Sequence, residues 1–318
     1  MVSYYLRVIF LKIIKCLFII PLFFLCSFRQ LGSSYIIMEA SSRRVLKAEN
    51  ENKELLIAST TKIMTAIVCI ESFDLNEEIL ILDDYTKAIG SSAYLKASDI
   101  LTREELLYAL MLRSGNDAAL ALSNNDSFDF IYLMNDLAKK IGMNDSYFVN
   151  SSGLDEENYN ISTAYDMALL MSYASQNETF LKIAGAKSYK IADKYTFINK
   201  HKLILSNDAI AGKTGYTTSS GRVLVTTFSK YNTKFVVVSI NAIDDWNLHK
   251  KLMNETTKYQ YKRILKKGYY DMYEIKYDIY LPIGRNENNI VLEFVNFNKR
   301  KYLQIYVDKR IIVKNLII

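Results

Sequence analysis

Residues 57–66, IASTTKIMTA, place Lys62 three positions after Ser59 in a run that is otherwise apolar or small. The apolar pattern continues on almost every side, which predicts a helix from about Leu55 to Ile70 buried between two layers. Side chains three positions apart share one helix face, so the serine and the lysine lie together. A buried amine loses its proton more easily and can then deprotonate the hydroxyl. Packing of the lysine stem with a snorkelling amine is the alternative explanation.

The composition of the chain restricts its class. Half of the 318 residues are hydrophobic and two are proline, which allows a large domain plus a small one. The formal charge is +6, but residues 1–34 account for +4, because they hold four basic residues and no acid. The rest of the chain has a net charge of +2, which gives no reason to expect that it binds nucleic acid. The two histidines, His201 and His249, exclude a histidine-rich metal site, and no metal or cofactor is expected. Cys69, the one cysteine beyond residue 34, is expected in the core.

Residues 1–34 are interpreted as a signal peptide or an N-terminal membrane anchor. Three basic residues precede a 13-residue stretch, Cys16 to Phe28, that is apolar except for Pro21 and Ser27. A membrane span needs roughly 20 apolar residues, so the length favours a signal peptide. A buried N-terminal helix is the structural alternative, and an uncleaved anchor stays open because no clear A-x-A site follows. We therefore expect an exported protein.

The remaining patterns predict an α+β fold. A hairpin at 34–48 and a second hairpin at 222–242 supply strands, and Thr102–Glu105 is a capping box that begins a helix. A long helix is expected from about Asp245 to Lys267, ended by Gly268. Further helices are expected at 117–122, 128–141 and 163–174. The expected domains are a body at 35–267 with a helical insertion at about 75–175, and a β-rich appendage at 268–318.

Two more motifs carry polar groups that suit a binding site. Lys213-Thr214-Gly215 precedes a strand and offers a cation and a hydroxyl to a carboxylate, while glycine permits close approach of a substrate backbone. The pattern Ser-x-Asn occurs at 114–116, 123–125 and 239–241. Ser114-Gly115-Asn116 is preferred because it lies in the break between two expected helices, where a turn can direct both side chains into a cleft. Each motif is weak by itself.

In the order Ser59-x-x-Lys62, Ser114-x-Asn116, Lys213-Thr214-Gly215, the motifs resemble those of penicillin-binding proteins and serine β-lactamases. The segments ASTTKIMTA, SGNDAALALS, SYFVNSSGLDEENYNISTAYDMALL and GKTGYTTSSGRVLVTT are similar to low-molecular-weight D-alanyl-D-alanine carboxypeptidases, peptidase family S11. The resemblance covers roughly residues 35–265. It implies the serine β-lactamase/transpeptidase-like fold, an antiparallel sheet flanked by helices with an all-helical insertion.

The resemblance also implies the chemistry of the first two motifs. The substrate would be a peptidoglycan stem peptide ending in D-Ala-D-Ala, with Ser59 attacking the penultimate D-Ala carbonyl and Lys62 acting as general base. Ser114 would relay a proton to the departing D-Ala, while Asn116 would bind the substrate amide and orient Lys62. β-Lactams would be covalent inhibitors. The enzyme would act at the outer face of the cytoplasmic membrane or in the cell-wall space, and the N-terminal segment would attach it to the membrane.

The third motif is assigned to substrate binding by the same resemblance. Lys213, Thr214 and Gly215 would hold the terminal carboxylate, and the backbone N–H groups of Ser59 and Tyr216 would form an oxyanion hole. Lys213 would also help to keep the general base neutral. The chain departs from the family in Ile210-Ala211-Gly212, where the family has Asp-Gly-hydrophobic, and in lacking an amphipathic C-terminal helix. Tyr165 replaces an arginine of the family's S-T-A-R-D-M-A pattern.

Two alternatives share the fold. A serine β-lactamase needs fast deacylation, and Glu156-Glu157-Asn158-Tyr159-Asn160 has the spacing of the E-x-x-L-N motif used in one class, although we interpret it as a solvated acidic loop. A non-catalytic peptidoglycan-binding protein is the second alternative. The intact Ser59, Lys62 and Lys213 argue against it.

Overall fold

The computed structural model describes residues 33–317 with three internal gaps, at 125–128, 156–158 and 298–299. Ser33–Ile318 form one compact unit. The expected leader, apart from its last two residues, lies outside the described part of the chain. Within the described ranges, no helix has the length and hydropathy needed to cross a membrane.

A five-stranded antiparallel sheet, ordered β2-β1-β11-β10-β9, is the centre of the fold. Its strands are β1 (Ser34–Glu39), β2 (Val45–Glu49), β9 (Ala211–Thr217), β10 (Gly221–Lys230) and β11 (Thr233–Ile240). Both expected hairpins are confirmed, and pairs such as Ile36 with Val238 join the N-terminal hairpin to the later one. Tyr231 and Asn232 have positive φ angles, as a tight turn between twisted strands requires. The sheet therefore joins segments about 200 residues apart in the sequence.

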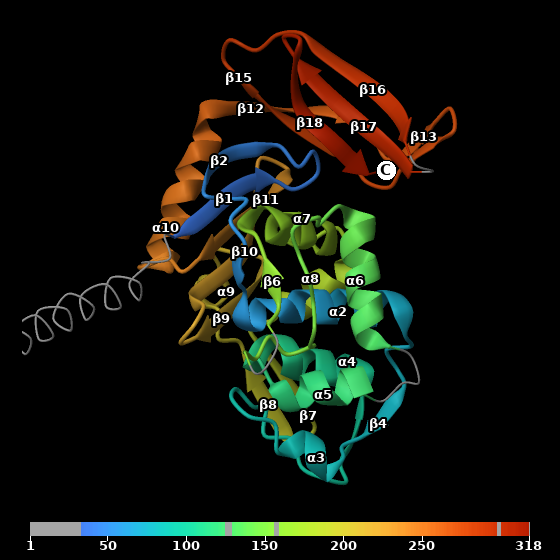
Figure 1. The fold of residues 1–318 in the computed structure, drawn as a ribbon, viewed down its shortest axis with the longest axis vertical. Coiled ribbons are helices and arrows are strands. Elements are labelled where there is room, and N and C mark those ends of the chain that lie inside the picture. Colours follow the sequence, from blue (N-terminus) through green and yellow to red (C-terminus); the bar gives the residue numbers. More distant parts are fainter. Residues whose placement is uncertain (1–32, 125–128, 156–158, 298–299, 318) are drawn as a thin grey trace, which may run out of the picture. The chain divides into compact units, whose positions relative to one another are not determined.

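Both faces of this sheet are buried, as the nearly continuous apolar strands require. Val236, Val238 and Ile240 point to the side covered by α7 (Ala164–Ala174), and they share one core cluster with the apolar residues of α2 (Lys62–Ser72). Phe235 and Val237 alternate with them and point to the side of α10 (Asp245–Leu252). The helices lie on opposite sides of the strands (Figure 1).

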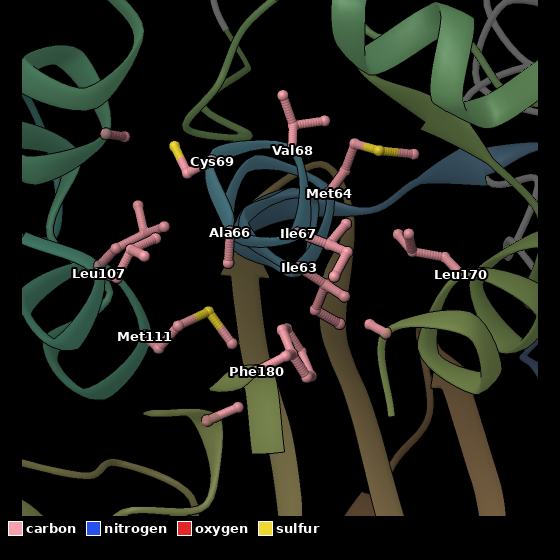
Figure 2. Packing of buried hydrophobic residues seen from close by; sticks show 14 of the residues in the cluster. Ile63, Met64, Ala66, Ile67, Val68, Cys69, Leu107, Met111, Leu170 and Phe180 are labelled. Carbon is pink, nitrogen blue, oxygen red and sulfur yellow. The ribbon is translucent and has the colours of Figure 1, made fainter. Parts of the chain in front are cut away.

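Helix α2 runs through the middle of the core. Residues 62–69 are all buried, and Figure 2 shows apolar side chains around the whole helix, including those of Ile63 and Ile67. Cys69 is buried there, as expected. The expected start at Leu55 is wrong, because Leu55–Leu56 form β3, paired with β6 (Ile161–Ser162), and η1 (Ala58–Thr61) is a 3₁₀ turn. Ala58 has a φ of 45°, which no α-helix accommodates.

The segment between the two hairpins holds most of the described helices, including those expected within residues 75–175. The capping box at Thr102 is confirmed, with its hydroxyl accepting from the Glu105 backbone N–H and the Glu105 carboxylate accepting in return. The helices are α3 (Asp83–Thr86), α4 (Arg103–Tyr108), the π-helical η2 (Ala109–Arg113), α5 (Asn116–Asn124), α6 (Phe130–Ile141), α7, α8 (Glu178–Ala184) and α9 (Lys202–Leu205). Short strands also occur: β4 (Glu78–Leu80), β5 (Ile100–Thr102), β6, β7 (Ser188–Ile191) and β8 (Tyr195–Ile198).

The long helix expected over 245–267 is wrong. Helix α10 ends at Leu252, a 3₁₀ segment η3 covers Met253–Lys258, and β12 (Tyr259–Leu265) pairs with β15 (Ile279–Gly284). Aromatic residues in this region favour an extended strand, and Tyr261 stacks on Tyr231 at 4.8 Å between ring centroids.

The chain ends in further strands, as expected, around a separate small core. These are β13 (Gly268–Tyr270), β14 (Tyr273–Ile275), β16 (Ile290–Phe297), β17 (Arg300–Val307) and β18 (Arg310–Ile317). Arg44, in the turn after β1, forms an ion pair with Glu287 at 2.7 Å and donates to the carbonyl oxygen of Pro282. These two contacts of Arg44 join the C-terminal strands to the N-terminal hairpin.

Candidate active site

Ser59 and Lys62 lie together at the start of the buried helix. Ser59 belongs to the η1 turn and is partly exposed, whereas Lys62 opens α2 and is fully buried. The Lys62 Nζ donates to Ser59 Oγ at 3.3 Å. The strained left-handed conformation of Ala58 directly precedes the serine, and such strain concentrates at functional sites.

The amine of Lys62 is held by two further acceptors. Its Nζ donates to Asn116 Oδ1 at 2.6 Å and to the backbone oxygen of Ser152 at 2.5 Å. Burial lowers the pKa of Lys62 from 10.5 to about 7, Asp117 opposes the shift, and the charge of Lys200 adds to it. A large fraction of the amine is therefore neutral near pH 7.

The Ser114-Gly115-Asn116 turn lies between η2 and α5, in the helix break expected from the sequence. Ser114 adopts a left-handed φ of 62° and caps η2. Asn116 also donates through Nδ2 to the Ile89 carbonyl at 2.6 Å, which fixes the amide so that its oxygen faces Lys62. The other two Ser-x-Asn serines lie elsewhere: Ser123 bonds Ser151, and Ser239 bonds His249 in the core.

Lys213 reaches the same turn from the edge strand β9. Its Nζ donates to Ser114 Oγ at 2.9 Å and to the Thr214 carbonyl at 2.8 Å, and its side chain is almost fully buried. Burial holds the pKa of Lys213 well below its usual value, and Lys62 and Lys200 lower it further. Burial is the main cause of the low Lys62 pKa, as expected, and the additional lowering comes from Lys200 rather than from Lys213, which we expected to help.

Gly215 brings β9 against the serine turn. A Cβ atom at Gly215 would lie 3.2 Å from the backbone nitrogen of Ser59 and 3.2 Å from the Ala58 methyl carbon. Even one methyl group would therefore push the strand away. Tyr216 follows with its side chain exposed, beside Arg222 on the paired strand. Tyr216, one of the two expected oxyanion-hole residues, thus directly follows the glycine that lies against the backbone of Ser59, the other one.

Some of these residues line a cleft of about 360 Å³, whereas the buried Lys62, Asn116 and Lys213 lie behind its wall. Its wall includes Ser59, Ser114, Thr214, Gly215, Tyr216, Lys200, Lys202, Arg222, Asp245 and Trp246. Arg222 and Asp245 pair with each other through two hydrogen bonds of 3.0 and 2.9 Å, which leaves the lysines as the unbalanced charges. The cleft therefore suits an anionic ligand. A larger cavity, of about 540 Å³, lies by Arg43 and Tyr277 and includes none of the expected site residues.

Three residues that were not expected at the site shape it: Asp117, Gly153 and Asn160, the last of which was interpreted as part of a solvated loop but is buried. Buried Asp117 accepts from the Ser92 hydroxyl and from the Ala93 and Leu95 backbone N–H groups, which holds that loop beside Asn116. Asn160 donates to the hydroxyl of Thr61, and Gly153 passes so close to Ala58 that no Cβ fits. Asp117 directly follows the Ser-x-Asn motif, which was a usable signal.

Other expected features are outside the cleft or outside the described residues. His201 and His249 are buried and do not line the cleft. Glu156, Glu157 and Asn158 of the lactamase-like spacing lie outside the described residues, while Asn160 is buried in a hydrogen-bond network. Among the residues that the structure describes, no cluster of metal-ligating side chains occurs.

Comparison with known proteins agrees with this geometry. The sequence pattern of the D-alanyl-D-alanine carboxypeptidases, peptidase S11, matches residues 30–244. The chain belongs to this family. It is 32% identical over 241 residues to a D-alanyl-D-alanine endopeptidase of Haemophilus influenzae, covering 73% of this chain and 80% of that protein. It is 29% identical to a D-alanyl-D-alanine carboxypeptidase of Bacillus subtilis, over 66% of this chain.

Solved structures of S11 proteins share the fold. A D-alanyl-D-alanine carboxypeptidase from Mycobacterium tuberculosis matches with a TM-score of 0.67 and 26% identity, covering 70% of this chain and 90% of that one. The Streptomyces K15 DD-transpeptidase matches with a TM-score of 0.65 and 27% identity, covering 70% and 95%. The α+β transpeptidase-like fold is thereby confirmed. The match spans 57% of the length of the B. subtilis relative.

Proposed function

We propose that this S11 protein is a serine D-Ala-D-Ala carboxypeptidase that removes the terminal D-alanine from peptidoglycan stem peptides. The observation that carries the proposal is the buried Lys62 amine, which lies 3.3 Å from Ser59 Oγ and has a pKa of about 7. A base with a pKa close to the working pH combines the right protonation state with useful basicity. No histidine is needed for this step.

Acylation uses the three motifs together. Ser59 Oγ attacks the carbonyl carbon of the penultimate D-Ala and its proton passes to Lys62 Nζ. The backbone N–H groups of Ser59 and Tyr216 stabilise the oxyanion. When the C–N bond breaks, Ser114 gives its hydroxyl proton to the amine of the departing D-Ala and takes the proton held by Lys62 in its place. Asn116 orients Lys62 throughout, consistent with its 2.6 Å contact.

Lys213 and Thr214 bind the terminal carboxylate of the substrate. An anion beside Lys213 offsets the repulsion from Lys62 and Lys200 and favours the protonated form of Lys213. Gly215 keeps this binding strand against the serine turn. Water then attacks the acyl-enzyme ester and releases the shortened peptide, whereas a β-lactam remains attached to Ser59.

The test is release of D-alanine from a peptide ending in D-Ala-D-Ala. Wild type should release it and Ser59→Ala should not, while a fluorescent penicillin should label wild type alone. Ser114→Ala should slow acylation strongly, and the matched variant Ser123→Ala, in the Ser-x-Asn outside the cleft, should not. Equal release by wild type and Ser59→Ala would contradict the mechanism.

The label also separates the alternatives. A stable adduct supports the carboxypeptidase, rapid turnover of the label supports a serine β-lactamase, and no adduct supports a binding protein. Because one relative is named an endopeptidase, a cross-linked peptide dimer should be tested beside the linear peptide. Cleavage of the dimer alone would assign endopeptidase activity.

The cellular setting belongs to the same proposal. The basic and apolar segment before residue 35 supports export, with the enzyme acting at the outer face of the cytoplasmic membrane or in the wall. The N-terminal segment would hold it at the membrane if it is not cleaved. We place the catalytic part at residues 35–267 and treat 268–318 as an appendage.

A further inference from the structure

Both histidines of the chain meet at one threonine hydroxyl beneath the cleft. His201 Nε2 lies 3.0 Å from Thr226 Oγ1, and His249 Nδ1 lies 2.9 Å from the same oxygen. The other nitrogen of His249 lies 3.0 Å from Ser239 Oγ. All four side chains are at most 1% exposed. Buried polar chains of this kind fix the geometry of the elements that they join.

This cluster touches both walls of the catalytic cleft. A Cβ atom at Gly212, the residue before Lys213, would lie 2.5 Å from His201 Nε2, so the imidazole ring sits directly on the binding strand. The same ring meets the edge of Trp246 at 5.0 Å between centroids. Trp246 lines the cleft from α10, the helix that also carries His249.

The hydrogen-bond pattern requires a hydroxyl at position 226. Burial lowers the pKa of His201 to about 3 and that of His249 well below its usual value, so both rings are neutral. A neutral imidazole donates from one nitrogen and accepts at the other. A hydroxyl can donate to one ring while it accepts from the second, which pairs the two ring nitrogens that face it, His201 Nε2 and His249 Nδ1. A methyl group in its place would leave two buried ring nitrogens unpaired.

A neighbouring residue supplies a matched comparison. Thr227 is as fully buried as Thr226, on the same strand but on the opposite face of the sheet. Its Oγ1 has no hydrogen-bond partner in the described part of the chain. Thr226→Val and Thr227→Val therefore each remove one fully buried hydroxyl from the same strand. Only the change at Thr226 removes hydrogen bonds to the residues that adjoin the cleft.

We propose that Thr226, bonded to His201 and His249, is a positioning residue that fixes the spacing between the Lys213-Thr214 strand and Trp246. This rests on the proposed function, because the strand is the one that binds the substrate carboxylate. Loss of the hydroxyl should loosen β9 relative to α10 and weaken substrate binding more than the chemical step at Ser59.

The experiment compares Thr226→Val, Thr226→Ser and Thr227→Val in the full chain. For D-Ala release from a peptide ending in D-Ala-D-Ala, Thr226→Val should raise KM by about tenfold, the equivalent of one hydrogen bond of about 1.4 kcal/mol, and change kcat much less. Thr226→Ser should restore the wild-type KM, and Thr227→Val should not alter it. Equal KM values for Thr226→Val and Thr227→Val would overturn the proposal.

Two further measurements keep the result interpretable. Amide hydrogen exchange in residues 211–217 should accelerate in Thr226→Val but not in Thr227→Val, and this holds whether or not the protein releases D-alanine. An inactive wild type would defeat the proposed function, whereas unchanged exchange would defeat the positioning role. If Thr226→Val does not fold, His249→Gln takes its place in the test. The glutamine amide can replace His249 Nε2 towards Ser239 but cannot replace Nδ1 towards Thr226, so this variant should raise KM. An unchanged KM would then contradict the proposal.

Discussion

The buried amine of Lys62 should make the stability of the fold depend on pH. Its pKa is about 7 in the folded protein and 10.5 in an unfolded chain. Since the folded value is lower, the unfolded state binds more protons between these two pH values. The free energy of unfolding therefore rises with pH across this window. Below pH 7 the amine is charged in the folded state, and the full cost of burying that charge lowers the stability. Lys62→Met removes the titrating group while it keeps a side chain of similar length.

The size of the effect follows from the two pKa values. Between about pH 6.5 and pH 9.5, Lys62 alone should add about 3 kcal/mol to the stability of wild type. Lys62→Met lacks this gain. The repulsion that Lys62 exerts on Lys213 also disappears, which increases the difference in the same direction. The hydrogen bonds to Asn116 and Ser152 are lost as well, so the change with pH is more informative than stability at one pH.

Urea unfolding of both proteins at the two pH values measures this difference. Wild type should gain about 3 kcal/mol more than Lys62→Met on going to the higher pH. Lys53→Met, at an exposed position, serves as the control and should keep the wild-type dependence. Equal gains in wild type and Lys62→Met would refute the conclusion that burial has lowered the pKa of this lysine.

Three other predictions concern Lys200, Gly153 and Arg44. The rate of acylation by a β-lactam should rise with pH around a midpoint near 7, and Lys200→Ala should move the midpoint upward, because Lys200 lowers the pKa of Lys62; an unchanged pH–rate curve would contradict this. Gly153→Ala should destabilise the protein by more than about 3 kcal/mol in urea, because its φ is +76° and a Cβ would lie 1.9 Å from the Ala58 carbonyl oxygen; wild-type stability would contradict it. Arg44→Ala should cost about 2 kcal/mol of stability by the same assay, since its buried guanidinium pairs with a carboxylate of the C-terminal strands, and a change within about 0.5 kcal/mol would show that this contact is dispensable.

The central sheet and the order of the motifs could be predicted from local patterns. The hairpins at 34–48 and 222–242 carry apolar strand runs with turn residues between them, and both strand pairs form. The spacing of Ser59 and Lys62 places them on one side of a single turn, even though that turn is 3₁₀ rather than α. Local patterns were sufficient wherever the deciding interactions lie within a few residues.

The errors arose where distant contacts override local preference. Leu55 and Leu56 continue the apolar pattern of the helix, but β6 pairs with them and holds them extended. The segment after Leu252 has charged and apolar residues at helical spacing, yet Tyr259–Leu265 pairs with β15, about twenty residues further along the chain. Gly153 appears unremarkable in the sequence because its role depends on its contact with Ala58.

The same burial that suits Lys62 to proton transfer works against the stability of the fold. Lys62 and Lys213 are both in the core, and their charged forms repel each other. The fold tolerates them because each has fixed acceptors: Asn116 and the Ser152 carbonyl for Lys62, and Ser114 with the Thr214 carbonyl for Lys213. Those acceptors come from segments that only the complete sheet and helix α2 bring together. The geometry of the candidate active site therefore depends on the whole domain, and the three short motifs locate this site but do not build it alone.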